Sequence, residues 1–411
     1  MAPSSDMAQA PNRGNPLTAS HRTARVLKGI DAIDADAWNG CANPRGAVFN
    51  PFLSHEFLHA LEASGSATGR TGWQPFHLVL SEGERVVGCV PLYLKGHSQG
   101  EYVFDHAWAE ALHRAGGSYY PKLLSSIPFT PATGRRLLCA ERDGETEGQL
   151  LDACAALAQQ VEVSSLHINF LPERQWRTAG QHGYLRRMDQ QFHWHNANYA
   201  SFDGFLADLS SKKRKNLRRE RREALAGDIS IEWVTGTDLT EGHWDAFHDF
   251  YMDTGARKWG SPYLTRRFFS LINETLADRT LLVMCKRNGR YIAGALNFIG
   301  DDALYGRNWG CIEDHRFLHF ETCYYQAIDF AIANGLARVE AGAQGPHKVV
   351  RGYLPEATYS AHWIREPAFR DAVARFLDAE RSHVSQDIDW VERRSPFKAG
   401  IDLSAIRSGG A

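Results

Sequence analysis

The residues best suited to chemistry in this sequence lie in one short loop, residues 340–355. Five polar side chains of different kinds fall within it, namely Glu340, Gln344, His347, Lys348 and Arg351. Glycines at 342, 345 and 352 allow positive φ and close approach of the backbone, so these side chains can converge on one ligand. A carboxylate, an imidazole and two cations are the groups that acid–base chemistry and anion binding use. The loop therefore predicts a ligand site, with a solvated loop between two strands as the alternative.

The bulk composition limits the classes of protein to which this chain can belong. At 411 residues it is too long for one ordinary core, so we expect two domains. The formal net charge of -2 gives no global attraction to nucleic acid or membrane, so any basic surface must be local. The cysteines are scattered and none forms a CxxC pair, which excludes a disulfide framework and a zinc knuckle. Reduced thiols fit a bacterial-type cytoplasm.

The two ends of the chain have the composition of loose segments. Residues 1–24 are small, polar and proline-containing, which predicts a disordered leader rather than a signal peptide. Residues 386–411 are expected to form a C-terminal tail that is loose from residue 406 onward. No segment offers the long uncharged apolar run that a membrane span requires, so we expect a soluble, cytoplasmic protein.

Between the ends, one structural plan occurs twice. A hairpin is expected at residues 75–94 and a similar one at 281–298, each with a short polar turn and a glycine in the returning strand. Each hairpin is followed by a loop-rich stretch, a helix and a further strand, which we place at 147–160 and 166–170, then at 321–334 and 338–341. This order predicts two copies of one α/β unit with mixed sheets, spanning 25–198 and 227–385. Two unrelated hairpins are the alternative. We also expect residues 101–108 to extend the first sheet.

The segment that joins the two copies, residues 199–226, is expected to be a basic linker helix. Its lysines and arginines surround a thin apolar stripe formed by Leu209, Leu217 and Leu225. Such a helix is either a solvated connector, partly neutralised by its own glutamates, or a site for phosphates of a nucleotide, coenzyme A or an RNA end. Duplex DNA is not expected as a partner, because the helix lacks the second helix of a helix-turn-helix.

Several of these segments resemble one known family. The run Lys212-Lys213-Arg214-Lys215-Asn216-Leu217 is similar to the K-x-R-x-N-apolar pattern of FemAB-like transferases, and His347-Lys348 after the glycine-rich turn resembles their aromatic/His-Lys segment. Residues 50–65, 118–123 and 351–364 resemble the bacterial branch assigned to peptidoglycan biosynthesis or recognition. The similarity follows the chain in order from Phe49 to His383. It implies two tandem acyltransferase domains of the GNAT type.

The resemblance also implies a reaction, the transfer of an acyl or aminoacyl group to a primary amine. It assigns Lys348 to the stabilisation of charge near the reacting carbonyl, and it puts the basic helix beside the donor. A Gln/Arg-x-x-Gly-x-Gly/Ala pyrophosphate loop is missing before the helix at 321, where the nearest segment is 316–321. Acyl-CoA and aminoacyl-tRNA therefore both remain open as co-substrates.

Within that reaction each candidate residue has a role and an alternative. Lys348 is the expected oxyanion stabiliser, Glu340 the expected base unless it pairs with Arg338, and His347 the other candidate base unless it faces solvent. The residues expected to bind the donor or another anion are Lys212, Lys213, Arg214, Asn216, Arg218 and Arg351. The residues expected to line the acceptor pocket are Tyr119, Tyr120, Lys122, Tyr305, Arg307, Asn308, Trp309 and Gln344. Arg307 and Arg351 could each hold a carboxylate or phosphate bidentately, and buried aromatic residues often belong to the core instead.

Covalent and metal-dependent mechanisms are not expected. Cys311 and Cys323 have no neighbouring His-Asp order that would activate either thiol. The histidine pairs at 193/195 and 315/319 lack a carboxylate at metal-ligand spacing. We therefore predict an N-acyltransferase acting on the amine of a small molecule or peptide, possibly with tRNA as a partner. A non-catalytic module that recognises cell-wall peptide or an anionic ligand is the alternative, and the oligomeric state stays open.

Overall fold

The computed structural model describes residues 22–141, 143–257, 262–342 and 345–409. Its strands form two sheets, and the smaller is antiparallel with the order β1-β3-β4-β7. These four strands are β1 (Arg22–Leu27), β3 (His77–Glu82), β4 (Arg85–Val90) and β7 (Leu138–Cys139). Strand β1 pairs with β3 from Arg22 onward, so residues 22–24, which we expected in the leader, belong to a strand.

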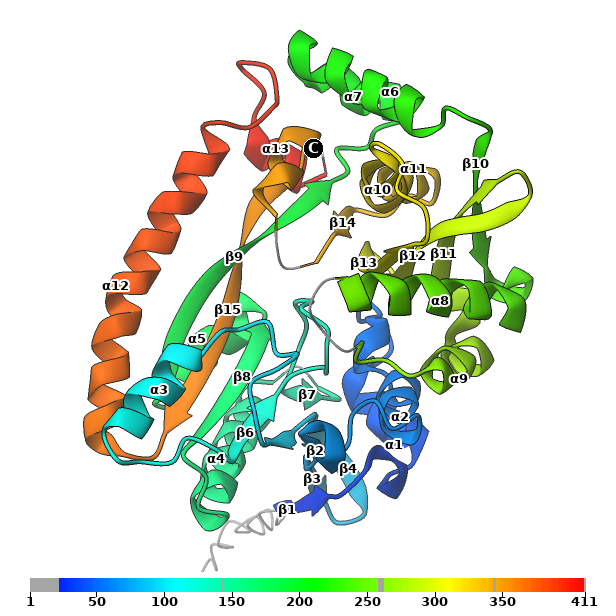
Figure 1. Cartoon of the computed structure of the whole chain (residues 1–411). Helices are drawn as coiled ribbons and strands as arrows, with labels where there is room; N and C mark the ends of the chain where they lie inside the picture. Colours follow the sequence, from blue (N-terminus) through cyan, green and yellow to red (C-terminus); the bar gives the residue numbers. More distant parts are fainter. Residues whose placement is uncertain (1–21, 142, 258–261, 343–344, 410–411) are drawn as a thin grey trace, which may run out of the picture.

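The larger sheet has eleven strands and runs through the whole molecule (Figure 1). In spatial order they are β10 (Ile229–Thr235), β11 (Thr280–Arg287), β12 (Arg290–Ile299), β13 (Ala303–Cys311), β14 (Arg338–Glu340), β9 (Leu185–His195), β15 (Leu354–Ile364), β8 (Ser165–Leu171), β6 (Lys122–Ser125), β5 (Tyr93–Lys95) and β2 (Trp73–Pro75). Strand β9 of the first half lies between β14 and β15 of the second half, and β15 in turn pairs with β8 of the first half. The two halves therefore exchange their last strands and share one continuous sheet.

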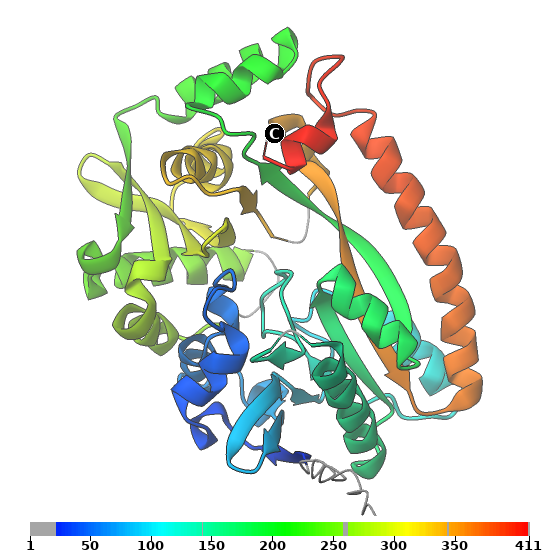
Figure 2. The ribbon, with the colours of Figure 1, turned by 180° about the vertical axis from the view of Figure 1, so that it is seen from behind.

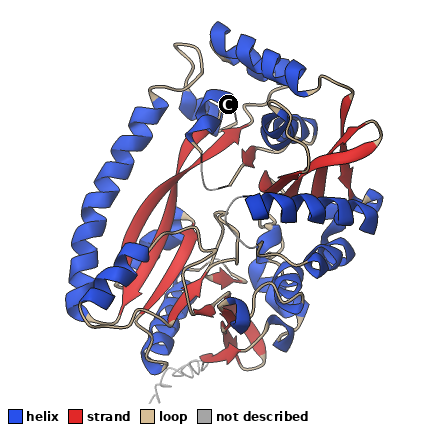
Figure 3. Cartoon of the chain, viewed as in Figure 1, coloured by secondary structure: helices blue, strands red, loops and turns tan. Residues whose placement is uncertain are grey.

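Helices cover both faces of this sheet (Figure 3). They are α1 (Ala35–Ala42), α2 (His55–Ala63), α3 (His106–Arg114), α4 (Gly144–Gln160), α5 (Glu173–Gln181), α6 (Phe202–Asp208), α7 (Ser211–Ala224), α8 (Glu241–Arg257), α9 (Arg266–Leu276), α10 (Leu318–Phe320), α11 (Gln326–Ala333), α12 (Pro367–Glu392) and α13 (Leu403–Arg407). The long helix α12 follows β9 and β15 along one side, and Figure 2 shows α4 and α5 on the face opposite α3. Among the described residues, no helix has the length and apolar composition that a membrane crossing requires.

The repeated plan predicted from the sequence is present. Hairpin β3–β4 has β1 beside its first strand and β7 beside its second, and hairpin β11–β12 is flanked in the same way by β10 and β13. The turn of the second hairpin uses positive φ at Asn288 and Gly289, which is the backbone that a tight two-residue turn needs. In both halves a helix then leads to a buried strand, α4 to β8 and α11 to β14. Local turn and pattern signals thus specified these elements correctly.

Three segments differ from the sequence prediction. Residues 101–108 form a loop and the start of α3 rather than a strand, because Glu101 and Asp105 turn inward to bind the buried Lys122 ammonium. The segment 199–226 is two helices, α6 and α7, which are interrupted where Leu209 has extended backbone and bridges to Phe397. The C-terminus is not loose as far as residue 409, because Ile406 of α13 is buried in the second core.

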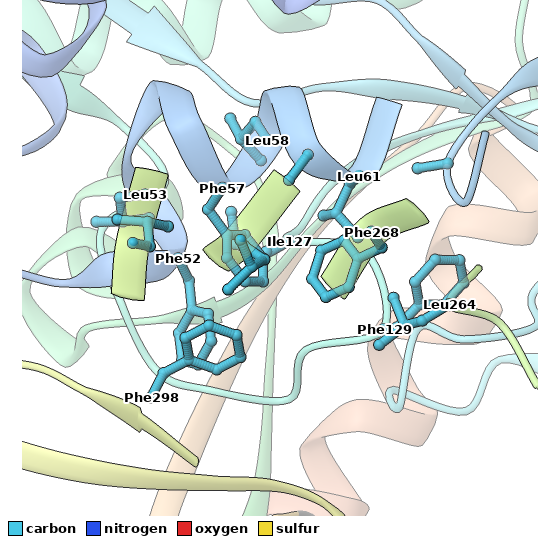
Figure 4. Close-up of a cluster of buried hydrophobic side chains, with 14 of the residues drawn as sticks. Phe52, Leu53, Phe57, Leu58, Leu61, Ile127, Phe129, Leu264, Phe268 and Phe298 are labelled. Atoms are coloured by element: carbon cyan, nitrogen blue, oxygen red, sulfur yellow. The ribbon is translucent and has the colours of Figure 1, made fainter. Parts of the chain in front are cut away.

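An apolar cluster joins the two halves (Figure 4). Phe52 and Phe57, from the first half, meet Phe298 of β12 with ring centroids 5.4 Å and 5.3 Å apart. Phe57 also packs edge-on against Phe268 of α9 at 5.8 Å. Because these rings come from both halves and are buried, the cluster fixes how the halves sit relative to each other.

We expect Phe57→Ala to lower the free energy of unfolding by about 3–5 kcal/mol, because it leaves a cavity where the halves meet. Denaturant unfolding measures the change, and Phe376→Ala on α12 is the matched control. Phe376 is 49% exposed, so its truncation should change stability by less than about 1 kcal/mol. Equal losses in the two variants would contradict a stabilising role for the cluster.

Candidate functional site

A wedge-shaped cavity opens where strands β13 and β14 separate. The two strands are paired in parallel only from Ala303 to Tyr305 of β13. From there to Cys311, β13 is paired with β12 on its other side but no longer with β14. A register shift between Leu296 and Asn297 of β12 lies beside this point, as bulges often do at functional sites. The cavity has a volume of about 90 Å³, and its walls include Gly306, Arg307, Asn308 and Trp309 from β13, Ala341, and His319, Cys323 and Tyr324 from the turn that precedes α11. We call it the wedge cavity.

The predicted loop 340–355 contributes Ala341 to the wall of the wedge cavity. Residues Pro346–Arg351 form a short 3-10 helix, and Gly342, Gly345 and Gly352 all have positive φ. The glycines therefore adopt the backbone conformation that the sequence suggested. Gln344, predicted to line the acceptor pocket, lies outside the described residues.

Lys348 is the central side chain of this loop. It is 1% exposed, and its ammonium donates a hydrogen bond to the carbonyl oxygen of Gly342 at 2.8 Å. Burial lowers the pKa of Lys348 to about 8, and the charge of the Cys323 thiolate would raise it. No carboxylate forms an ion pair with Lys348 in the described part of the chain. Lys348 does not itself line the wedge cavity, but its hydrogen-bond acceptor Gly342 directly follows the wall residue Ala341.

His347 and Glu340 occupy different surroundings from each other. His347 is exposed and shares a hydrogen bond of 2.9 Å with the hydroxyl of Tyr324, a wall residue of the wedge cavity. Partial desolvation of the ring and the charges of Lys348 and Arg351 lower the pKa of His347, which favours the neutral imidazole. Glu340 is buried and accepts a hydrogen bond from Arg338 at 2.9 Å, as in the alternative considered from the sequence. That pairing makes Glu340 a poor general base.

Arg351 acts as a structural clamp rather than as an open anion site. Its guanidinium donates to Tyr325 at 3.1 Å, to the carbonyl of His347 at 2.8 Å and to Glu220 of α7 at 2.8 Å. It also stacks 3.5 Å from the ring centroid of Phe320. With these contacts made, Arg351 holds the loop against α7 and has no bidentate face left for a donor phosphate.

Helix α7 has one bound side and one side that faces solvent. On the bound side, Glu220 meets Arg351, and Arg221 binds Glu321 and Asp329 at 2.8 Å and 2.6 Å. On the other side Arg218 is paired with Asp203 at 2.7 Å. Within the described segments no ion pair is formed by Lys212, Lys213, Arg214 or Lys215. The first turns of α7 therefore present uncompensated positive charge, as an anion-binding surface requires.

Two of the predicted acceptor residues belong instead to a buried polar network. Lys122 is fully buried between β5 and β8, and it donates to Ser98 at 2.8 Å, to Glu101 at 2.7 Å and to Asp105. Tyr119 donates to the same Asp105 carboxylate at 2.7 Å. Burial raises the pKa of Glu101 to about 7. These partners satisfy Lys122 and Tyr119 internally, while Tyr120 is half-buried and bonds Ser98.

The predicted residues of β13 do come together around cavities. Trp309 lines the wedge cavity, and Arg307 and Asn308 line both it and a second cavity of about 20 Å³. The second cavity is walled by aromatic side chains that the sequence did not single out, Tyr102, Phe129, Tyr251 and Tyr263. Tyr305 is buried and faces a third, separate cavity beside Asp302 and Arg338.

A further cavity of about 190 Å³ shares the wall residue Tyr102 with the second one. It is also lined by Gln190 and Gln191 of β9 and by Thr358, Tyr359 and Ser360 of β15. The exchanged strands thus form part of the wall of this cavity. Its residues carried no sequence signal, because strand exchange is a long-range feature.

No metal site is visible in the described ranges, where no group of three or more His, Cys, Asp or Glu side chains is arranged to hold an ion. The histidine pairs noted in the sequence have other partners. His195 bonds Glu356 at 2.9 Å, His315 bonds Glu313 at 2.8 Å, and the His319 ring packs 5.3 Å from Trp309.

Comparison with known proteins adds a family and a fold. Residues 29–399 match a family described as FemAB-like, peptidoglycan biosynthesis/recognition. The chain is similar in structure to FemX, with a TM-score of 0.53, 12% identity, and coverage of 86% of this chain and 100% of that one. It also aligns with L-PGS from Bacillus licheniformis at a TM-score of 0.49, 10% identity and coverage of 81% and 98%. A tandem GNAT protein from the clavulanic acid biosynthesis pathway aligns at a TM-score of 0.43 and 11% identity, with coverage of 84% of this chain and 99% of that one. No curated protein matches the chain. The predicted mixed α/β fold is confirmed by the sheets of this chain and by its structural likeness to FemX.

The clamp between Arg351 and Glu220 can be tested by stability. We expect Glu220→Ala to lower the free energy of unfolding by about 3 kcal/mol, because it leaves a buried guanidinium without its partner. Asp203→Ala is the control, since it removes an exposed ion pair on the same helix and should cost at most about 1 kcal/mol. Calorimetry or denaturant unfolding measures both. Equal effects would mean that Arg351 is not held by Glu220.

Proposed function

Because this chain belongs to the FemAB-like family of peptidoglycan biosynthesis/recognition proteins, we propose that it is an N-acyltransferase. It moves an acyl or aminoacyl group from a thioester or an aminoacyl-tRNA to the primary amine of a small molecule or peptide. The observation that carries this proposal is Lys348, a buried ammonium without an ion-pair partner in the described chain, which is hydrogen-bonded to Gly342, the residue after the cavity-wall residue Ala341.

The wedge suits the acyl donor. Beyond Tyr305, no strand among the described residues pairs with the edge of β13 that faces β14, so its backbone groups are available to an extended ligand. A donor chain lying along Gly306 to Trp309 brings its carbonyl into the cavity. The positive first turns of α7 then serve the phosphates of coenzyme A or of a tRNA end. This arrangement supports both donor classes.

Transfer begins when the acceptor amine attacks the donor carbonyl. The carbonyl oxygen gains negative charge, and the Lys348 ammonium stabilises it. The amine must lose a proton, and the Tyr324 hydroxyl lies between the cavity and the neutral imidazole of His347. We assign His347 as the proton acceptor through Tyr324. Collapse of the intermediate breaks the bond to the donor sulfur or ribose oxygen and leaves an amide, and the proton taken up by His347 returns through Tyr324 to the leaving sulfur or oxygen.

We expect Lys348→Ala to lower turnover by about 100-fold, because the developing oxyanion loses its charge partner. Since Lys348 must be protonated and burial lowers its pKa to about 8, activity should fall as the pH rises through that value. Lys348→Arg keeps the positive charge at higher pH, so the fall in activity should shift to a higher pH. Lys28→Ala, an exposed lysine of the first half, is the control. Unchanged turnover in Lys348→Ala would remove it from the mechanism.

Charge reversal on α7 tests the donor surface. Lys212→Glu with Lys213→Glu should raise the KM for the donor, leave the KM for the acceptor unchanged, and weaken the salt dependence of donor binding. Arg290→Glu, an exposed arginine on the β11–β12 turn, is the control. Assays with acyl-CoA and with charged tRNA in parallel identify the donor. Binding of cell-wall peptide without transfer from either donor would favour the non-catalytic recognition module instead.

A further inference from the structure

Arg307 has almost no partner, in contrast to five other buried or half-buried arginines. Arg187, Arg221, Arg338 and Arg351 each form a short ion pair with one or more carboxylates. Arg136 has no carboxylate, but three backbone carbonyls accept from its guanidinium. In the part of the chain that the structure describes, Arg307 forms no ion pair, and its one hydrogen bond goes to the carbonyl oxygen of Phe129.

Arg307 lies where its unpaired guanidinium can contact a ligand. It lies on β13 just beyond the point where β14 stops pairing, and it lines both the wedge cavity and the adjoining aromatic cavity. Asn308, the next residue, also lines both. A ligand that occupies either cavity therefore lies next to this guanidinium. A partly desolvated cation without a counter-ion is unfavourable unless a ligand supplies the negative charge.

The surroundings select the kind of anion. Phe129 and Tyr263 are stacked 4.6 Å apart, and the hydroxyl of Tyr251 is occupied by the backbone N–H groups of Tyr263 and Leu264. Arg307 is the one charged side chain on the wall of the aromatic cavity, as far as the described residues show. A single guanidinium neutralises a carboxylate bidentately, whereas a diphosphate carries more charge than one cation can match.

We propose that Arg307 binds a carboxylate of the acceptor, so that the acceptor class is an amine that carries a carboxylate near the reacting nitrogen, as an amino acid or the end of a peptide does. This inference rests on the proposed acyl transfer. Held between Arg307 and the wedge, the acceptor presents its amine to the donor carbonyl in a fixed orientation. The positive charge of Arg307 also favours loss of the ammonium proton from the bound acceptor.

Equilibrium binding tests the subsite without any transfer. The probes are an N-acetyl amino acid, which resembles the product, and its C-terminal amide, which lacks the negative charge. Arg307→Gln should weaken binding of the carboxylate probe by about 10-fold to 100-fold and leave binding of the amide unchanged. Arg307→Lys, which keeps the charge but not the fork, should restore part of the loss. Arg290→Gln is the control and should bind both probes normally. A thermal melt of each variant reports whether it is folded.

Transfer assays then assign the carboxylate to one substrate. Amino acids should be better acceptors than the matched amines without a carboxylate, and Arg307→Gln should abolish the preference. If Arg307→Gln instead lowers turnover with a succinyl donor, which carries a carboxylate on its acyl chain, and not with a propionyl donor, the assignment to the acceptor is overturned. An equal loss of turnover with every acceptor overturns it too and points to oxyanion stabilisation. Transfer without any carboxylate preference refutes this inference alone. Arg307-dependent carboxylate binding without transfer to any amine refutes the proposed reaction alone.

Discussion

The exchange of strands between the two halves is the constraint on which the remaining architecture depends. Strand β9 pairs along nine positions with β15, from His193 opposite Leu354 to Leu185 opposite His362, and it pairs with β14 on its other side. Neither half can complete its sheet alone. Since β14 is fixed by a strand of the first half, the point where β13 leaves β14 is fixed as well. The wedge cavity is therefore a product of both halves, although its walls come from the second.

Charge is distributed unevenly between the scaffold and the wedge. In the scaffold, buried ionic groups are satisfied, as in the network of Lys122, Glu101 and Asp105 and in the pair of Arg338 with Glu340. Around the wedge, Lys348 and Arg307 are shielded from water but lack carboxylate partners among the described residues. Burying a charge without a partner destabilises the fold. Such groups are expected where the missing partner is a ligand or a transition state, because the same field then stabilises the charge that develops there.

The sequence could predict what local chemistry determines. Turn residues and alternation identified both hairpins, and the glycines of 340–355 identified the loop that carries Lys348. It could not predict outcomes that depend on distant partners. The carboxylates of Glu101 and Asp105 look like ordinary polar residues until Lys122, from another strand, is placed between them. Glu340 could be either a free base or the ion-pair partner of Arg338, and only the position of Arg338 shows that the two are paired. Tyr102, Tyr251 and Tyr263 carry no pattern of their own and meet only because the halves pack together.

The turn before α11 connects helix α7 to the wedge cavity. Residues Glu321–Tyr325 form a π-helical turn, and such turns often occur at functional sites. Cys323 and Tyr324 face the wedge cavity, while Glu321 and Tyr325 bind Arg221 and Glu220 of α7. Arg351 ties the other wall of the wedge to the same Glu220. Helix α7 is thus fastened to both walls. Helix α7 would therefore be a rigid support for a polyanionic donor bound on its exposed side. The ion pairs of Glu220 and Arg221 on its inner side provide that attachment.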